Sequence, residues 1–185
     1  MIRHGSEEWA AARATRLTAS DFGAALGINP YCSRQKLWRI KVGLETVETN
    51  GHMQRGIDNE QEAIFCYEVE TGLLVDEASL VLHPAHDWLA ATPDGAVEND
   101  GLVEVKCPAR LRDHVPEYHY AQVQGQLEVT GREFCDYFQF AEEGTSTIRV
   151  LRDKSWWNRA FPFLEEFWAC VVSMEPPKRS MRKFI

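Results

Sequence analysis

Long hydrophobic runs are missing from this chain of 185 residues. No apolar stretch is long enough to span a bilayer, and residues 1–8 lack the apolar segment of a secretory signal peptide. Internal repeats and low-complexity tracts are also missing, and no linker is long enough to separate domains. We therefore expect one domain over residues 1–185 that is cytoplasmic and not in a membrane.

Several signatures of cofactor and nucleotide chemistry are missing too. The five cysteines are scattered, odd in number and without a Cys-x-x-Cys pair, which indicates free thiols in a reducing compartment and argues against an iron–sulfur site. The six histidines form no His-Glu-x-x-His zinc pattern. No glycine-rich Walker loop is present, which argues against an NTP-driven motor.

Positive charge is in deficit, because 20 lysines and arginines stand against 28 aspartates and glutamates, a net charge of −8. This balance argues mildly against nucleic acid as a partner, but the local field decides phosphate binding, and bound metal ions would offset some of the acids. Each basic cluster is either a phosphate contact or a solvated helix face or tail. The clusters are Arg13 and Arg16; Arg34, Lys36, Arg39 and Lys41; and Lys178, Arg179, Arg182 and Lys183.

The hydrophobic period predicts helices first and then a change to strands. Helices are expected at residues 6–14, from a cap at 18–21 to about 27, at 33–42, 51–70, 115–130 and 154–173. Strands are expected at residues 74–82, 88–92, 102–106, 134–140 and 147–151. This order predicts an α/β (α+β) fold with a central mixed sheet flanked by helices.

What the chain does carry is Pro93-Asp94-Gly95, followed after a short gap by Glu104-Val105-Lys106. A turn places Asp94 at the end of one strand, and strand alternation puts Glu104 and Lys106 on the same face of the next. If the two strands pair, the three side chains converge on one spot. Each also has an ordinary explanation, since an aspartate suits a turn and a Glu-x-Lys pair suits a solvated face.

A fourth acid, Glu60, lies in the middle of a helix face formed by Met53, Ile57, Ile64 and Tyr67. We expect this carboxylate to point at the core, where it is costly unless it is paired or binds a metal. The alternative is a structural ion pair.

Gln122 is the fifth candidate, because it shares an inward helix face with Tyr118, Gly125 and Val129. An inward glutamine needs hydrogen-bond partners. It either satisfies a backbone group or holds a water, a ligating carboxylate or a phosphate oxygen.

Three carboxylates and a lysine suit hydrolysis of a phosphodiester with Mg²⁺. Magnesium prefers hard oxygen ligands, and a pair of ions stabilises both the attacking and the leaving oxygen. Lys106 would position the attacking water and offset charge at phosphorus, and the backbone carbonyl of Val105 is a natural extra ligand.

Six motifs in order carry a family resemblance that covers about residues 8–151. The motifs are Trp9-Ala10-Ala11-Ala12-Arg13, Leu17-Thr18-Ala19-Ser20-Asp21-Phe22, Gly56-Ile57-Asp58-Asn59-Glu60, Ala91-Thr92-Pro93-Asp94-Gly95, Glu104-Val105-Lys106-Cys107-Pro108 and Ala121-Gln122-Val123-Gln124-Gly125. In these motifs the chain resembles nucleases of the PD-(D/E)xK superfamily. More narrowly, it resembles the lambda-exonuclease-type, or YqaJ-like, phage recombination nucleases.

The resemblance implies a restriction-endonuclease-like catalytic core at residues 73–151, between N-terminal helices at 6–72 and a last helix at 154–173. Two Mg²⁺ ions, with Mn²⁺ as a substitute, would be bound by three carboxylates and a backbone carbonyl, beside a catalytic lysine and a supporting glutamine. The implied residues are Glu60, Asp94, Glu104, Val105, Lys106 and Gln122.

The N-terminal helices would bind the DNA end. Arg13 matches the arginine that binds the terminal 5′-phosphate in such exonucleases, and Ser20 lies in the adjoining motif. The family digests one strand of duplex DNA from the 5′ end and leaves a 3′ overhang for a single-strand annealing protein. Its best-known member is a trimeric ring, whereas this chain is shorter and has His119 in place of an aromatic residue. The resemblance thus implies duplex DNA ends and an annealing protein as partners, a homo-oligomer, and the host cytoplasm as the compartment.

Two other functions remain open from the sequence. A nicking or structure-specific endonuclease of the same fold would use the same acids. A non-catalytic DNA-binding module would keep only the fold, but it has no need of an inward-facing Glu60.

Overall fold

The computed structural model describes residues 6–46 and 51–178, without the side chains of His52, Met53 and Ile57. Arg179, Arg182 and Lys183 of the last basic cluster lie outside the described residues. The helices are α1 (Glu7–Ala14), the 3-10 helix η1 (Ala19–Asp21), α2 (Phe22–Ala25), α3 (Arg34–Lys41), α4 (Gly51–Thr71), α5 (Glu117–Thr130) and α6 (Lys154–Val172). The strands are β1 (Leu17–Thr18), β2 (Val75–Asp76), β3 (Val81–Leu82), β4 (Leu89–Ala91), β5 (Gly95–Val97), β6 (Gly101–Lys106), β7 (Phe134–Ala141) and β8 (Gly144–Leu151).

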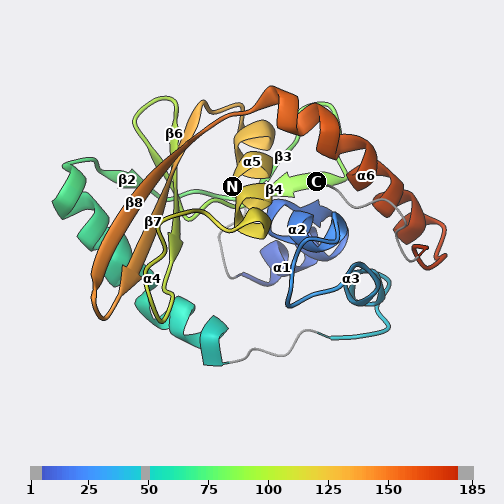
Figure 1. Cartoon of the computed structure of the whole chain (residues 1–185). Coiled ribbons are helices and arrows are strands. Elements are labelled where there is room, and N and C mark those ends of the chain that lie inside the picture. The colour runs from blue at the N-terminus through green and yellow to red at the C-terminus, as the bar shows by residue number, and fades with distance from the viewer. Residues whose placement is uncertain (1–5, 47–50, 179–185) are drawn as a thin grey trace.

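The strands form two sheets flanked by helices, which confirms the expected fold class (Figure 1). The larger sheet has the order β2-β5-β6-β7-β8 and is parallel only between β6 and β7. The smaller sheet has the order β1-β4-β3. In Figure 1, α5 stands between the larger sheet and the group formed by α2, α3 and α6.

Both faces of β6 are packed. Val103 and Val105 belong to one hydrophobic cluster with Tyr67 of α4, whereas Leu102 belongs to another with Leu127 of α5. Because side chains alternate along a strand, the even-numbered positions of β6 face α5. The expected shared face of Glu104 and Lys106 is therefore confirmed, and it is the face that α5 covers.

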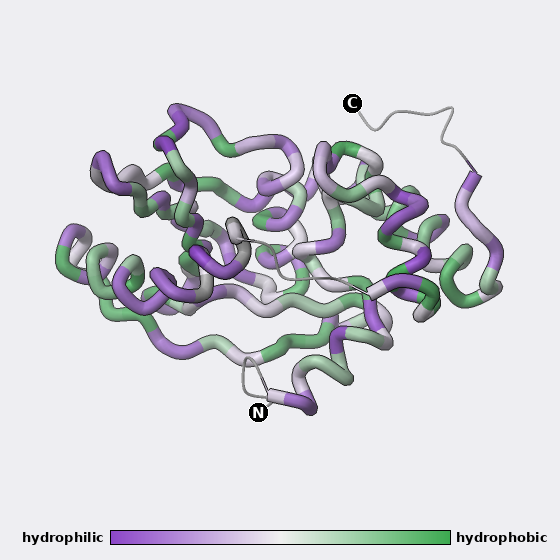
Figure 2. The backbone as a smooth tube through the Cα atoms, turned by 90° about the horizontal axis from the view of Figure 1, so that it is seen from below, coloured by the Kyte–Doolittle hydropathy of each residue, from purple (hydrophilic) through white to green (hydrophobic). Residues whose placement is uncertain are grey.

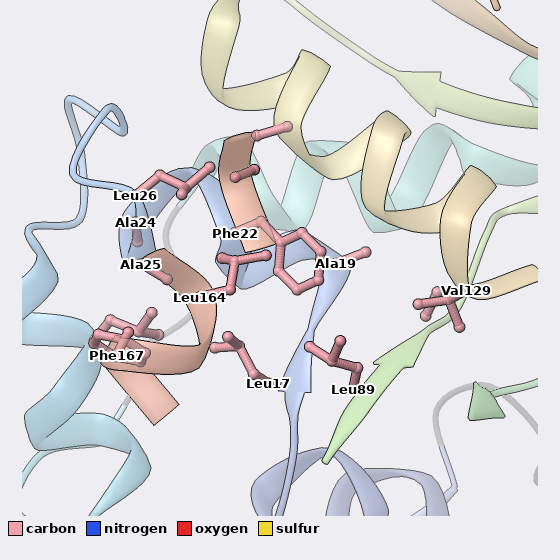
Figure 3. Packing of buried hydrophobic residues seen from close by; sticks show 14 of the residues in the cluster. Leu17, Ala19, Phe22, Ala24, Ala25, Leu26, Leu89, Val129, Leu164 and Phe167 are labelled. Carbon is pink, nitrogen blue, oxygen red and sulfur yellow. The ribbon is translucent and has the colours of Figure 1, made fainter. Parts of the chain in front are cut away.

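A further hydrophobic core joins the N-terminal helices to α5 and α6. Phe22 lies at its centre with Ala19 and Leu164 beside it (Figure 3). A Cβ atom at Gly125 of α5 would overlap the ring of Phe22, and one at Gly23 would lie 2.8 Å from the Cβ of Tyr118. Because both residues are glycines and have no Cβ atom, the N-terminal segment packs directly against α5.

The strand expected at residues 74–82 is wrong. The chain there forms two short strands in different sheets, because Val75 pairs with Val97 of β5 whereas Val81 pairs with Ala91 of β4. The charged pair Asp76-Glu77 is exposed at the crossing between the sheets. A local hydrophobic pattern cannot show that the chain changes partner.

Other boundaries also differ from the expectations. Two strands were not expected: β1, where a helix cap was predicted, and β5, which begins at the glycine of the predicted turn. Strand β8 begins at Gly144 rather than Thr147, since only two residues separate it from Ala141. Helix α5 begins at Glu117 because Pro116 is its N-cap. The other helices lie within a few residues of the predicted ranges.

All five cysteines are free thiols, as expected. Figure 2 shows that hydrophobic and hydrophilic stretches are distributed along the whole chain. Across residues 6–46 and 51–178, no helix is long and apolar enough to cross a membrane.

Candidate active site

The carboxylate of Asp94 caps the end of a strand ladder. Strand β5 pairs with β6 from Gly95 opposite Val103, so β5 offers no partner to the last residues of β6. The Oδ2 atom of Asp94 accepts a hydrogen bond from the backbone N–H of Val105 at 2.7 Å. The side chain thus takes the place of a strand partner, which fixes its position relative to Glu104.

Glu104 is only 1% exposed, yet both of its carboxylate oxygens have donors. Its Oε1 atom accepts from Gln122 Nε2 at 2.6 Å and from the ammonium of Lys106. Its Oε2 atom accepts from Gln126 Nε2 at 2.6 Å. Three donors on its two oxygens hold this buried carboxylate in a single orientation.

Gln126 is the site residue that the sequence reasoning missed. It lies four residues after Gln122 on α5, so the two side chains emerge one above the other on the same helix face. The spacing of the two glutamines was the available signal. The Oε1 atom of Gln126 is buried without a hydrogen-bond partner among the described residues. The hydrogen bond from its Nε2 atom to Glu104 therefore orients the Gln126 side chain.

Glu60 is partly exposed, which corrects the expectation that it points into the core. Helix α4 buries Ala63 and Tyr67 against the larger sheet. Glu60 precedes Ala63 by about one turn, and its charge helps to raise the pKa of Asp94. Met53 and Ile57, which belonged to the predicted apolar face, have side chains outside the described part of the chain.

The charges of the site are strongly coupled. Burial raises the pKa of Asp94 well above its ordinary value, and the charges of Glu104 and Glu60 raise it further. Burial also opposes the charge of Lys106, but Glu104 and Asp94 overcome this effect and raise the lysine pKa above its usual range. Lys106 is therefore an ammonium at neutral pH, which makes it a donor and not a base. Three carboxylates against one lysine leave an excess of negative charge.

The chemical type of the ligands at this site, carboxylate oxygens, suits a hard divalent cation. Glu60, Asp94 and Glu104 offer carboxylate oxygens, and the excess negative charge would be offset by such an ion. In the described part of the chain, no three His, Cys, Asp or Glu side chains are already gathered into a group that could hold a metal ion. For Val105, the structure shows the N–H in contact with Asp94, and its carbonyl as a ligand stays a prediction.

Arg13 and Ser20, to which the family resemblance assigns a terminal 5′-phosphate, lie in contact. Arg13 Nη2 donates to Ser20 Oγ at 2.9 Å, and its guanidinium lies 4.4 Å from the ring centroid of Trp9. Trp9 Nε1 donates to Thr92 Oγ1 at 3.0 Å, two residues before Asp94 in sequence. Burial lowers the pKa of Arg13, and the negative charges of Asp21 and Glu104 oppose that effect. The arginine therefore lies within electrostatic reach of the buried carboxylate.

Lys41 of the second basic cluster is neither a phosphate contact nor a solvated residue. Its side chain is 8% exposed, and its ammonium lies 2.7 Å from Asp21 Oδ2. It also donates to the backbone carbonyl of Arg16 at 2.8 Å. Asp21 accepts in turn from Thr18 Oγ1 at 2.7 Å. This ion pair ties the end of α1 to η1 and so supports the segments that carry Arg13 and Ser20.

Comparisons with known proteins give the family of this chain and structures similar to it. The profile of the YqaJ-like viral recombinase domain matches residues 8–133. The alkaline exonuclease LHK-Exo from Laribacter hongkongensis is 29% identical with a TM-score of 0.78, over 91% of this chain and 94% of that one. The same enzyme in complex with dAMP gives a TM-score of 0.79 at 28% identity, over 91% of this chain and 94% of that one.

Two further similarities support less detailed conclusions. A phage-related exonuclease from Haemophilus somnus has a TM-score of 0.62 at 14% identity, over 85% of this chain and 92% of that one, and shows the fold alone. An uncharacterised protein of Acanthamoeba polyphaga mimivirus is 31% identical over 156 residues, which is 72% of this chain. This chain spans only 28% of the length of that curated relative.

Proposed function

This chain belongs to the family of YqaJ-like viral recombinase domains, and from that membership we propose that it is a metal-dependent nuclease that digests duplex DNA from its ends. The observation that carries the proposal is the buried carboxylate of Glu104, held by Lys106, Gln122 and Gln126 beside Asp94. The similarity to the alkaline exonuclease LHK-Exo over 91% of this chain supports the reaction class.

The released product is a nucleoside monophosphate. LHK-Exo has been crystallised with dAMP, which is the kind of product that stepwise hydrolysis of a DNA strand releases. The proximity of Arg13 to the acids supports the same reaction, because a terminal phosphate held there brings the first phosphodiester near Glu104. We assign 5′-phosphate binding to Arg13 and Ser20, which makes the polarity 5′ to 3′ and leaves a 3′ overhang.

Each residue of the site has a distinct task. Lys106 donates hydrogen bonds from its ammonium to the attacking water or to a phosphate oxygen, because its raised pKa rules out a role as base. Gln122 keeps Glu104 in one orientation, and the Val105 N–H does the same for Asp94. Two Mg²⁺ ions, replaceable by Mn²⁺ and held by Glu60, Asp94, Glu104 and the Val105 carbonyl, would supply water activation and charge neutralisation at phosphorus.

The assembly follows from the same proposal. Within a single nuclease domain, the helices of residues 6–72 carry the DNA-end-binding residues Arg13 and Ser20 together with Glu60, residues 73–151 form the catalytic core, and a last helix follows at 154–173. A homotrimeric ring would hold the duplex, and a single-strand annealing protein would take up the 3′ overhang. The host cytoplasm is the compartment in which this reaction takes place.

The decisive experiment compares linear and closed circular duplex DNA. A linear duplex labelled at one end, with or without a 5′-phosphate, is incubated with the protein and Mg²⁺ beside the circle. We expect mononucleotides from the 5′-phosphorylated strand and an intact circle. The Lys106→Ala variant is expected to bind the ends without hydrolysing them. Rapid cutting of the circle would show an endonuclease, and unchanged cleavage by Lys106→Ala would remove that residue from the mechanism.

A further inference from the structure

An exposed tyrosine stands beside the amino end of α5. Tyr31, in the loop between α2 and α3, is 73% exposed. Its ring meets that of Tyr118 edge to face, with the centroids 5.8 Å apart and the planes at 82°. This contact leaves most of the Tyr31 ring open, so the loop presents an aromatic surface to whatever approaches α5.

Tyr118 places this surface next to the acids. It lies four residues before Gln122 on α5, which is one helical turn or about 6 Å along the helix axis. Burial raises the pKa of the Tyr118 phenol, and the charges of Arg112 and Lys106 oppose that rise, so both cations lie near the ring. The aromatic pair is therefore one turn of helix from the glutamine that holds Glu104.

Hydrogen bonds within the loop hold the backbone that carries Tyr31. The side-chain Oδ1 of Asn29 accepts from the backbone N–H of Tyr31 at 2.8 Å and from that of Cys32 at 3.2 Å. The Gly23 carbonyl accepts from the backbone N–H groups of Ile28 and Asn29. A ring that is exposed on an ordered loop pays little conformational entropy when it binds a flat partner.

We propose that Tyr31 and Tyr118 form a stacking platform for an unpaired nucleobase of the DNA strand that is being digested. The proposal rests on the proposed function and specifies how the end of the duplex is opened. A base that leaves the duplex loses its stacking partners, and an aromatic ring replaces them regardless of base identity. The nearby guanidinium of Arg112 holds a phosphate that flanks that base.

A nucleobase fits this platform better than an apolar protein segment. The open surface is a single ring: among the described residues, the exposed large hydrophobic side chain nearest to Tyr31 in sequence is Leu44, and the exposed Lys36 in between is charged. Stacking of a base on an aromatic side chain is worth about 5- to 150-fold in affinity. Such a gain from one ring suits the first unpaired nucleotide of a strand.

The test measures binding in the Lys106→Ala background, so that the substrate is not cut. The probe is a 5′-phosphorylated duplex with 2-aminopurine near the 5′ end, titrated in Mg²⁺ while its fluorescence is followed. Removal of the ring by Tyr31→Ala is expected to weaken binding at least fivefold and to brighten the bound probe, because the base is no longer stacked. Tyr31→Phe is expected to behave like the parent.

Two controls separate stacking from other effects. Phe65→Ala removes an aromatic residue with a similar exposure, 63%, from α4 and is expected to change nothing. A duplex with abasic nucleotides at the same positions is expected to bind the parent as weakly as Tyr31→Ala binds normal DNA, with no further loss when both changes are combined. Thermal unfolding checks that Tyr31→Ala is folded.

The outcomes distinguish this proposal from the nuclease itself. Equal affinity and equal fluorescence in Tyr31→Ala overturn the platform, as does an equal loss on normal and abasic DNA. If the protein with Lys106 intact digests linear ends while Tyr31→Ala binds normally, the platform is wrong and the proposed function stands. If it does not digest ends, the proposed function fails, and the platform is judged on binding alone.

Discussion

The amide of Gln126 offers a sharp test of how the site is held. Gln126→Met keeps an unbranched side chain of similar length but removes the donor to Glu104 Oε2. A hydrogen bond to a charged group contributes about 1.5–3 kcal/mol. If that amount is lost in the transition state, kcat falls by about 10- to 100-fold, because about 1.4 kcal/mol is tenfold in rate.

The same change is expected to have little effect on stability. Removing the amide leaves one oxygen of Glu104 without a donor, which costs stability, but it also removes the buried Oε1 of Gln126 that has no partner. The two effects are opposite in sign and each is worth about 1–3 kcal/mol. We therefore expect a net change in the free energy of unfolding of about 1 kcal/mol or less.

Gln124, two residues earlier on α5, is the matched control. It is equally buried, but its Nε2 donates to the Leu151 carbonyl at 2.8 Å and its Oε1 accepts from the Asp153 N–H at 2.8 Å. Asp153 is the N-cap of α6, so Gln124→Met loosens the start of that helix. We expect about 2–4 kcal/mol of lost stability and an unchanged kcat per folded molecule.

Single-turnover digestion of an end-labelled duplex and urea unfolding of the same preparations give the two quantities. The expected pattern is crossed: Gln126→Met is slower but stable, and Gln124→Met keeps its kcat but is less stable. Full activity in Gln126→Met would refute the reasoning that the donor to Glu104 matters. A large loss of stability there would show that the amide serves the core instead.

Three further predictions concern other parts of the molecule. Arg13→Gln is expected to lower the ratio of digestion rates on 5′-phosphorylated and 5′-hydroxyl ends by about tenfold or more, and an unchanged ratio would place the phosphate elsewhere. Gly125→Ala is expected to cost about 1–3 kcal/mol in urea unfolding by crowding Phe22, with partial recovery when Phe22→Leu is added; a neutral effect would contradict the close packing. Burial, with help from Lys106 and Arg112, lowers the pKa of His119 to about 3 from 6.5. Between these two pH values the unfolded chain binds a proton at His119 that the folded protein does not bind. The free energy of unfolding therefore falls as the pH drops below 6.5, by up to about 1.4 kcal/mol per pH unit. His119→Gln is expected to flatten this slope, and an equal slope in the variant would exclude His119 as its source.

Part of the active site was predictable because it depends on local geometry. Alternation along β6 places Glu104 and Lys106 on one face. The position of Gln122 on an inward helix face was predictable in the same way. In each case the backbone period alone decides the direction of the side chain. The approach of Asp94 was expected from pairing of the strand at 88–92 with 102–106, but that strand lies in the smaller sheet, and the partner of β6 is the unexpected strand β5, which begins directly after Asp94.

The remaining features depend on which elements meet. Glu60 was expected to point into the core, but it is partly exposed, because α4 packs on the larger sheet through the later residues Ala63 and Tyr67. The crossing of residues 74–82 between two sheets and the burial of Lys41 against Asp21 likewise depend on partners far away in sequence. A local pattern carries no information about such partners.

The sequence by itself determined which polar side chains share a face, since alternation along β6 sets the directions of Glu104 and Lys106 and the helical period sets that of Gln122. Only the tertiary structure decided which partners those side chains meet. The packing of α5 on β6 places Gln126 in hydrogen-bond contact with Glu104. Gly23 and Gly125, which have no side chain, allow the N-terminal segment to pack against the same helix. The physical reason is that a period sets the direction of a side chain, whereas close packing between distant segments sets what it touches.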